Sequence, residues 1–159
     1  MKEENINALD EINKGACMGI DAIHFVLDKV EDDKLKKELE KEYKEYQKIS
    51  ERIEKIYPKY NDDKPHETNA ITKAMTWYGI EMKTLTDTSA SKIAELILQG
   101  LNMGIIEGRK ILNKKEIVQE VEELIDDYVI MQEKNVEKIK TYLWYVFLWK
   151  NKIKIAFPF

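Results

Sequence analysis

Apolar residues recur every three or four positions along almost the whole chain, which is the spacing of one buried face of an α-helix. The first such stripe consists of Ile6, Leu9, Ala16, Ile20, Ile23, Leu27 and Val30. Continued along the sequence, the same spacing predicts helices over residues 4–31, 33–57, 67–86, 90–112 and 115–149. Six glycines and three prolines in 159 residues are too few for a turn-rich β protein, and no strand pattern precedes residue 150. The chain is therefore predicted to be all-α.

The connections between these helices predict their arrangement. Asp32 and Asp33 supply a turn and an N-cap, and this link is so short that the first two helices must be antiparallel neighbours. Residues 58–65 form the clearest loop, and Asn113-x-x-Glu116 has the spacing of a capping box at the start of the last helix. We expect an up-down bundle of four long helices plus a connecting fifth helix, which either crosses the bundle or lies antiparallel to it.

Three glycines follow one another at four-residue intervals in the fourth predicted helix: Gly100, Gly104 and Gly108. Each one lowers helix stability by up to about 1 kcal/mol relative to alanine, so another interaction must compensate. Close approach of two helices is the first interpretation, and space for a bound ligand is the alternative. A membrane-spanning segment is excluded here, because Asn102 and Glu107 interrupt the apolar residues.

Charge and cysteine content exclude several classes of protein. The 26 basic and 30 acidic residues give a net charge of −4, and the signs alternate along the second helix, which is typical of a solvated face and not of a nucleic-acid interface. The N-terminus is acidic where a signal peptide is basic. Cys17 is the single cysteine, which excludes an internal disulfide and suits a reducing compartment. We expect a cytoplasmic protein that does not bind nucleic acid.

A carboxylate-bridged metal site in a helical bundle uses Glu-x-x-His pairs, because this spacing turns both side chains toward the interior. The chain has no such pair and only two histidines, His24 and His66. Asp21-x-x-His24 is the nearest match, and it lies beside the apolar stripe of the first helix. The sequence therefore predicts no metal site of this kind. The alternative is a divergent iron or manganese site, for which the candidate ligands are Asp21, His24, Glu42, Glu45 and Glu107.

Polar residues nevertheless interrupt the apolar stripes of three helices. The candidates for a hydrogen-bonded polar network in the core are Asn13, Glu42, Tyr43, Tyr46, Gln132 and Asn135. Gln132 and Asn135 have the spacing of a Glu-x-x-His pair but carry amides, which form hydrogen bonds well and bind iron or manganese poorly. We therefore predict a structural network at the place where a metal site would otherwise lie.

Three stretches carry a family resemblance. Residues 9–20, 38–46 and 99–105 resemble the corresponding parts of small bacterial ferritin-like proteins related to rubrerythrin, within a region of about residues 5–143. The resemblance implies a ferritin-like up-down bundle over residues 1–143. The composition of residues 144–159, which are aromatic and contain three lysines but no acidic residue, indicates a separate C-terminal extension. The resemblance also suggests oxidase, peroxidase or iron-storage activity for those relatives that bind metal.

In metal-binding relatives, the resemblance implies a glutamate near Ala16, a second near Leu101, a histidine near Tyr43 or Tyr46, and another near Asn135. This sequence has none of these ligands at those positions. We therefore expect a non-catalytic interaction or scaffold protein with a degenerate metal site and no cofactor. The alternative is a divergent metal-binding oxidoreductase that uses iron or manganese.

The C-terminal segment is unusually aromatic, because seven of the 15 aromatic residues fall within the last 18 positions. Three interpretations stay open: packing on the bundle or on a second subunit, contact with a membrane surface, and an end without a selected role. The sequence favours packing, and we expect a homodimer whose contact includes Trp144, Phe147 and Trp149.

Overall fold

The computed structural model describes residues 2–65, 73–113 and 116–143, and only the backbone of residues 73–77. Four long α-helices make up most of the structure: α1 (Lys2–Leu27), α2 (Asp33–Ile56), α4 (Ala90–Leu112) and α5 (Gln119–Ile139). They are joined by a shorter helix, α3 (Lys73–Lys83), and by two 3-10 turns, η1 (Tyr57–Lys59) and η2 (Lys140–Tyr142). Every regular element in the described ranges is helical, which confirms the predicted all-α class.

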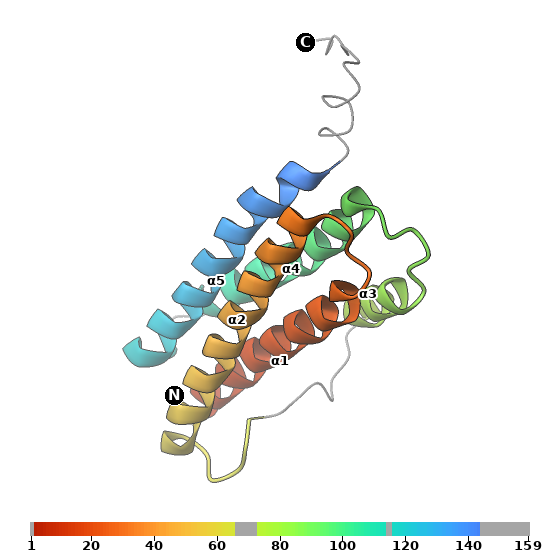
Figure 1. Ribbon diagram of the computed structural model, residues 1–159. Coiled ribbons are helices and arrows are strands. Elements are labelled where there is room, and N and C mark those ends of the chain that lie inside the picture. Colours follow the sequence, from red (N-terminus) through yellow and green to blue (C-terminus); the bar gives the residue numbers. More distant parts are fainter. Residues whose placement is uncertain (1, 66–72, 114–115, 144–159) are drawn as a thin grey trace, which may run out of the picture.

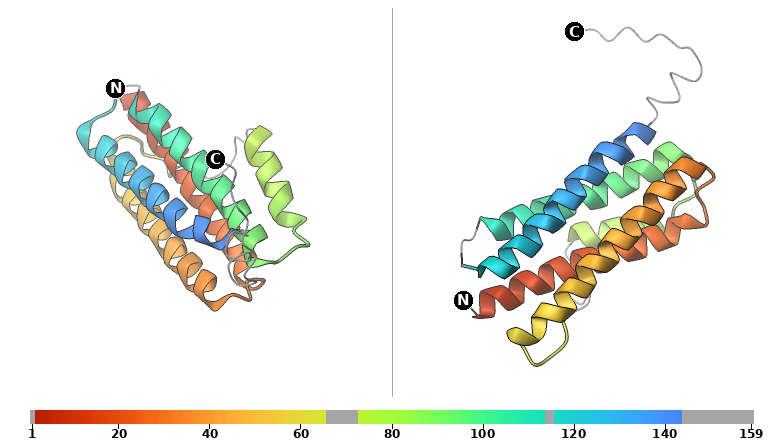
Figure 2. Two further views of the ribbon diagram at one scale, coloured as in Figure 1. Left: turned by 90° about the horizontal axis from the view of Figure 1, so that it is seen from above. Right: turned by 60° about the vertical axis from the view of Figure 1, so that its left-hand side comes forward.

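The four long helices form a bundle of two hairpins (Figure 1). Helix α1 packs along α2 and α4 packs along α5, while the hairpins meet through α1 with α4 and α2 with α5. Helix α3 lies outside this four-helix unit, beside α1 and α4 (Figure 2). The predicted bundle of four long helices plus a fifth is therefore confirmed, with the fifth helix on its flank.

Cross-helix contacts fix α2 and α5 as antiparallel neighbours. The Tyr46 hydroxyl donates a hydrogen bond to Gln132 Oε1 at 2.7 Å. One and a half turns further along α2, Arg52 forms an ion pair with Asp127 at 2.8 Å. Residue numbers thus rise along α2 as they fall along α5, which brings residues 42–46 of α2 opposite residues 132–135 of α5.

Side-chain caps explain where two of the helices begin. The Asp32 carboxylate accepts hydrogen bonds from the backbone N–H groups of Lys34 and Leu35, which starts α2. The Ser89 hydroxyl accepts one from the N–H of Lys92, which starts α4. Such caps satisfy amide groups that have no partner within the helix and typically contribute about 1 kcal/mol each.

The core is made of apolar side chains from the long helices, joined by Tyr78 and Met82 from α3. The largest fully buried side chains are those of Tyr57, Tyr128, Leu9, Ile12, Ile23, Leu35, Leu39, Ile53, Ile93, Leu96, Leu101 and Leu124. Burial of each aliphatic side chain stabilises the fold by about 1.5–3 kcal/mol relative to leaving it exposed. The periodic stripes in the sequence are thus the surfaces along which the helices pack.

Four predicted helix boundaries are wrong, and one of them is the end of the connecting helix, which lies at Lys83 and not at residue 86. The first helix ends at Leu27 and not at residue 31, and the last begins at Gln119 and not at residue 115. Asn113, expected to begin the last helix, instead ends α4, because its N–H donates to the carbonyl of Arg109. Helix α5 ends at Ile139 and is followed by η2, and the predicted continuation over residues 144–149 lies outside the described residues.

Candidate functional site

Two polar pairs face each other across the seam between α2 and α5. Glu42 and Glu45 lie three residues apart on α2, and Gln132 and Asn135 have the same spacing on α5. Asn135 Nδ2 donates a hydrogen bond to Glu45 Oε2 at 2.9 Å, and the Tyr46 hydroxyl donates to Gln132 Oε1. The i, i+3 spacing puts each pair on one helix face, and the antiparallel register brings the two faces together.

Glu42 is the most unusual member of this cluster. Its side chain is buried, with 2% of its surface exposed, and its Oε2 has no hydrogen-bond partner among the described residues. Burial, and then the negative charge of Glu45, raise the pKa of Glu42 to about 8, although the Lys138 ammonium opposes the shift. In the absence of a bound cation, Glu42 is therefore mostly protonated at neutral pH.

Three buried tyrosines and a second unpaired polar atom lie in the same part of the core, and the negative charge of Glu42 acts on two of the tyrosines, Tyr46 and Tyr78. Burial raises the pKa of Tyr46, Tyr78 and Tyr128 above the ordinary tyrosine value, so all three stay protonated at neutral pH. The rings of Tyr46 and Tyr128 lie 6.4 Å apart between centroids. Gln132 is fully buried, and its Nε2 has no hydrogen-bond partner within the part of the chain that the structure describes.

The remaining members of the predicted polar network lie elsewhere. Asn13 is buried on α1 and accepts a hydrogen bond from the Ser50 hydroxyl at 3.2 Å, two turns along α2 from Glu42. Tyr43 is half-buried against the core. Of the six predicted residues, the structure thus gathers Glu42, Tyr46, Gln132 and Asn135 at the α2–α5 seam.

The candidate metal ligands do not all converge. Asp21 and His24 are exposed on α1, while Glu107 on α4 forms an ion pair with Lys110 at 2.8 Å. Across residues 2–65, 73–113 and 116–143, no group of three or more His, Cys, Asp or Glu side chains has an arrangement that could hold a metal ion. Glu42 and Glu45 supply carboxylate oxygens, which suit one hard cation and do not suit a histidine-liganded metal pair.

Glycines on α1 and α4 make room for the tyrosines and Gln132. A Cβ atom on Gly104 would lie 1.7 Å from Gln132 Nε2, and one on Gly19 would lie 2.4 Å from the Tyr46 ring. A Cβ atom on Gly100 would lie 2.7 Å from the Tyr78 hydroxyl. The glycines therefore allow tyrosine and glutamine side chains of neighbouring helices to approach the backbone.

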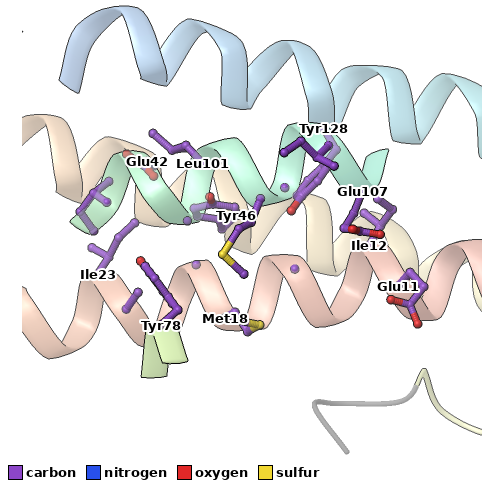
Figure 3. Close-up of a pocket in the computed structure, with 18 residues that line it drawn as sticks. Glu11, Ile12, Met18, Ile23, Glu42, Tyr46, Tyr78, Leu101, Glu107 and Tyr128 are labelled. Carbon is purple, nitrogen blue, oxygen red and sulfur yellow. The ribbon is translucent and has the colours of Figure 1, made fainter. Parts of the chain in front are cut away.

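A cavity of about 260 Å³ remains between α1 and α4, with Tyr78 of α3 and Glu42 of α2 in its wall (Figure 3). Sequence reasoning named Glu42 and Tyr46 but missed Tyr78 and Tyr128 as members of this site. The feature of the sequence that could have indicated a cavity here is the four-residue spacing of the glycines, Gly15 and Gly19 on one helix and Gly100 and Gly104 on the other. That signal indicates small residues facing each other but does not identify the side chains that approach them.

No protein-family model and no curated protein sequence matches the chain. A solved structure is similar to it: a dodecameric thioferritin, the bacterioferritin-related protein from Bacteroides fragilis. The TM-score is 0.75 at 11% sequence identity, and the match covers 98% of this chain and 93% of the other. At this level of identity, the likeness concerns the fold.

This comparison corrects two expectations. The expected non-catalytic scaffold protein is wrong, because the similar structure is a thioferritin. The expected homodimer is also wrong, because that structure is described as a dodecamer. The residues proposed for the dimer contact, Trp144, Phe147 and Trp149, lie outside the described residues.

Among the helices that the structure describes, none is long and apolar enough to cross a membrane. The chain has a ferritin-like fold.

Proposed function

We propose that this protein is a divergent metal-binding member of the ferritin-like proteins, and that it binds a divalent iron or manganese ion through Glu42 and Glu45. The fold similarity to a thioferritin supports a metal-related role. The observation that carries the proposal is the buried Glu42 carboxyl, whose Oε2 has no hydrogen-bond partner among the described residues and which lies close to a second carboxyl on the same helix face.

The electrostatics of the pair favour a cation. The Glu45 carboxylate repels a negative charge on the buried Glu42, and this repulsion contributes to the raised pKa of Glu42. A divalent ion would compensate both charges and displace the proton from Glu42, so that metal binding would release a proton. Carboxylate oxygens are hard donors, and manganese is among the ions that such donors suit.

Neighbouring side chains would orient this site. Asn135 holds one Glu45 oxygen through its amide hydrogen bond, and Tyr46 holds Gln132 in the same way. Contacts of this kind orient metal ligands and tune their affinity. A bound iron or manganese ion would supply redox chemistry at this position. The buried tyrosine rings would limit the access of water from the core side.

The proposal extends to location and assembly. The single cysteine suits a reducing compartment such as the cytoplasm. We further propose that the chain assembles into more than two copies, as the similar thioferritin does. Exposed apolar side chains on three helices support this assembly, namely Ile80, Ile106 and Ile130, with exposed fractions of 54%, 53% and 37%.

Metal titration tests the metal site directly. Chelator-treated protein is titrated with Mn²⁺ under anaerobic conditions, and binding is followed by calorimetry and by the electron paramagnetic resonance signal of the free ion. We expect a single metal ion per chain in the wild type and loss of that ion in Glu42→Gln. Glu40→Gln is the matched control, because Glu40 is exposed on the same helix.

The outcome separates the site from non-specific binding. Binding that is absent in the wild type, or that is unchanged in both Glu42→Gln and Glu45→Gln, would contradict the proposal. Circular dichroism of each variant establishes that the bundle is still folded. The same titration with Fe²⁺ shows which of the two metals the site prefers.

A further inference from the structure

The cavity between α1 and α4 is elongated and mainly apolar. Its wall includes residues from Glu11 to Ile23 on α1 and from Ile97 to Glu107 on α4. The α1 part alone spans about 18 Å at the usual rise of an α-helix. Apart from tyrosine hydroxyls and three carboxyl groups, the lining consists of aliphatic, methionine and glycine residues. A slot of this shape suits an unbranched apolar molecule.

The carboxyl groups of the cavity lie at its ends (Figure 3). Glu42 lies at one end, and Glu11 and Glu107 lie at the other. Glu11 and Glu107 are partly exposed, and each forms an ion pair with a lysine three residues further along its helix. Glu42 differs from them, because it is buried and its Oε2 has no partner in the described part of the chain. It is thus a buried polar group in contact with an apolar space.

We propose that this cavity binds a small organic molecule with an unbranched alkyl body and one hydrogen-bond-donating head group, which donates to the Glu42 carboxyl. An apolar cavity of about 150 Å³ is already large enough to bind benzene. The cavity of about 260 Å³ therefore has room for a longer molecule. A bound head group would give Glu42 Oε2 the hydrogen bond that the protein itself does not supply, and the alkyl body would bury apolar surface on both helices.

Hydroxyl and amine head groups share this chemistry but differ in charge. A hydroxyl group can donate to the carboxyl whether that group is protonated or ionised. A protonated amine requires the ionised carboxylate and would form a buried ion pair with it. Replacement of Glu42 by glutamine separates the two classes, because glutamine accepts a hydrogen bond from either head group but cannot form an ion pair with an ammonium group.

This ligand site goes beyond the metal-binding proposal, although both use Glu42. A metal ion and a head group would compete for the same carboxyl oxygens. The binding experiment is therefore performed on chelator-treated protein, and metal titration is kept as a separate measurement. If the protein binds metal but no alkyl compound, only the proposal of a cavity ligand is overturned. If it binds an alkyl compound but no metal, only the proposal of a metal site is overturned.

The test uses 1-heptanol and heptylamine with the full-length chain, followed by isothermal titration calorimetry and by thermal unfolding. We expect saturable binding of at least one of the two, with a rise in the unfolding temperature. Ala22→Leu fills the slot from α1, and we expect it to weaken binding by about tenfold or more. Met18→Trp fills the slot from another position and gives a second variant in case the first does not fold.

Asn102→Leu is the matched control, because it adds a similar apolar side chain at an exposed position of α4 that does not line the cavity. We expect it to bind the ligand as the wild type does. Absence of saturable binding to the wild type by both compounds would overturn the proposal. Equal binding by the wild type and by a folded slot-filling variant would overturn it as well, because the ligand would then lie elsewhere.

Discussion

Glu42 is held by the fold in surroundings that favour its neutral form. Its pKa is raised from 4.5 to about 8, so the folded protein binds this proton more tightly than the unfolded chain does. The stabilising contribution of the protonated group is therefore complete below about pH 4.5 and is lost as the pH rises through about 8. For metal-free protein, we expect the free energy of unfolding to fall by up to a few kcal/mol over this range.

The comparison with Glu42→Gln isolates this effect, because glutamine cannot ionise. Urea unfolding in the presence of a chelator, at several values between pH 5 and pH 8, should give a flatter stability profile for the variant than for the wild type. Parallel profiles would show that Glu42 has an ordinary pKa in the folded protein. Glu40→Gln, on the exposed face of α2, should follow the wild type.

Gly104 allows the closest side-chain approach in the bundle core. In Gly104→Ala, the added methyl group would lie 1.7 Å from Gln132 Nε2 and 2.7 Å from the Tyr128 hydroxyl. We expect a destabilisation of about 1–3 kcal/mol, because Gln132 and Tyr128 are buried and must move. Gly79→Ala is the control, because no described atom lies within 4 Å of its added methyl group.

We expect the control variant Gly79→Ala to be slightly more stable than the wild type, whereas Gly104→Ala is less stable. Gly79 lies within helix α3, where alanine is favoured over glycine by about 0.5–1 kcal/mol. Thermal unfolding of both variants measures the difference. A neutral Gly104→Ala would mean that the core accommodates the methyl group and that the glycines of α4 are not required for packing.

At the scale of helices, the start of α5 depends on a long-range contact. The backbone N–H of Val118, the N-cap residue, donates to Asn5 Oδ1 of α1 at 2.9 Å, and Asn5 is buried. In Asn5→Ala, this N–H loses its acceptor, which we expect to destabilise the protein by about 1–3 kcal/mol. Asn7→Ala, at an exposed position of the same helix, should have little effect on the unfolding temperature, and equal effects of the two variants would contradict this role of Asn5.

This contact also explains why the start of α5 is not predictable from local sequence. Asn113 and Glu116 have capping-box spacing, but Asn113 serves as the C-cap of α4. The residue that precedes α5 is valine, which has no capping side chain, and its partner is more than a hundred positions away. Helix α4, by contrast, has a local cap at Ser89, and its bounds agree with the predicted range of 90–112.

The same distinction applies to the site. Helical spacing places Glu42, Gln132 and Asn135 on buried faces, and all three are buried in the structure. The contact between Asn135 and Glu45 depends on the register of α2 against α5, which no single-helix pattern specifies. The cavity depends further on the position of α3, because Tyr78 forms part of its wall. Sequence periodicity thus predicts which residues face inward, and the packing of helices decides which of them meet.

At the scale of the whole molecule, the surface bears apolar side chains that the bundle does not cover. Ile80, Ile106 and Ile130 belong to three different helices, α3, α4 and α5, and more than a third of each side chain is exposed. Scattered exposed apolar residues are common on monomers, so their number alone decides nothing. Because they lie on different helices, they could belong to different subunit contacts, as an assembly with more than one kind of interface requires.

Sedimentation equilibrium of the intact chain measures this assembly, and we expect more than two copies per particle. Replacing Ile130 by aspartate would place a charge in an interface that includes α5, so Ile130→Asp should shift the particle toward fewer copies while its helix content stays unchanged. Gln119→Asp is the control, because it adds the same charge at an exposed polar position of α5. A monomer or dimer for the intact chain at micromolar concentration would contradict the proposed assembly. It would leave the metal site intact, since Glu42 and Glu45 lie on α2 and their polar contacts described above are made within one chain.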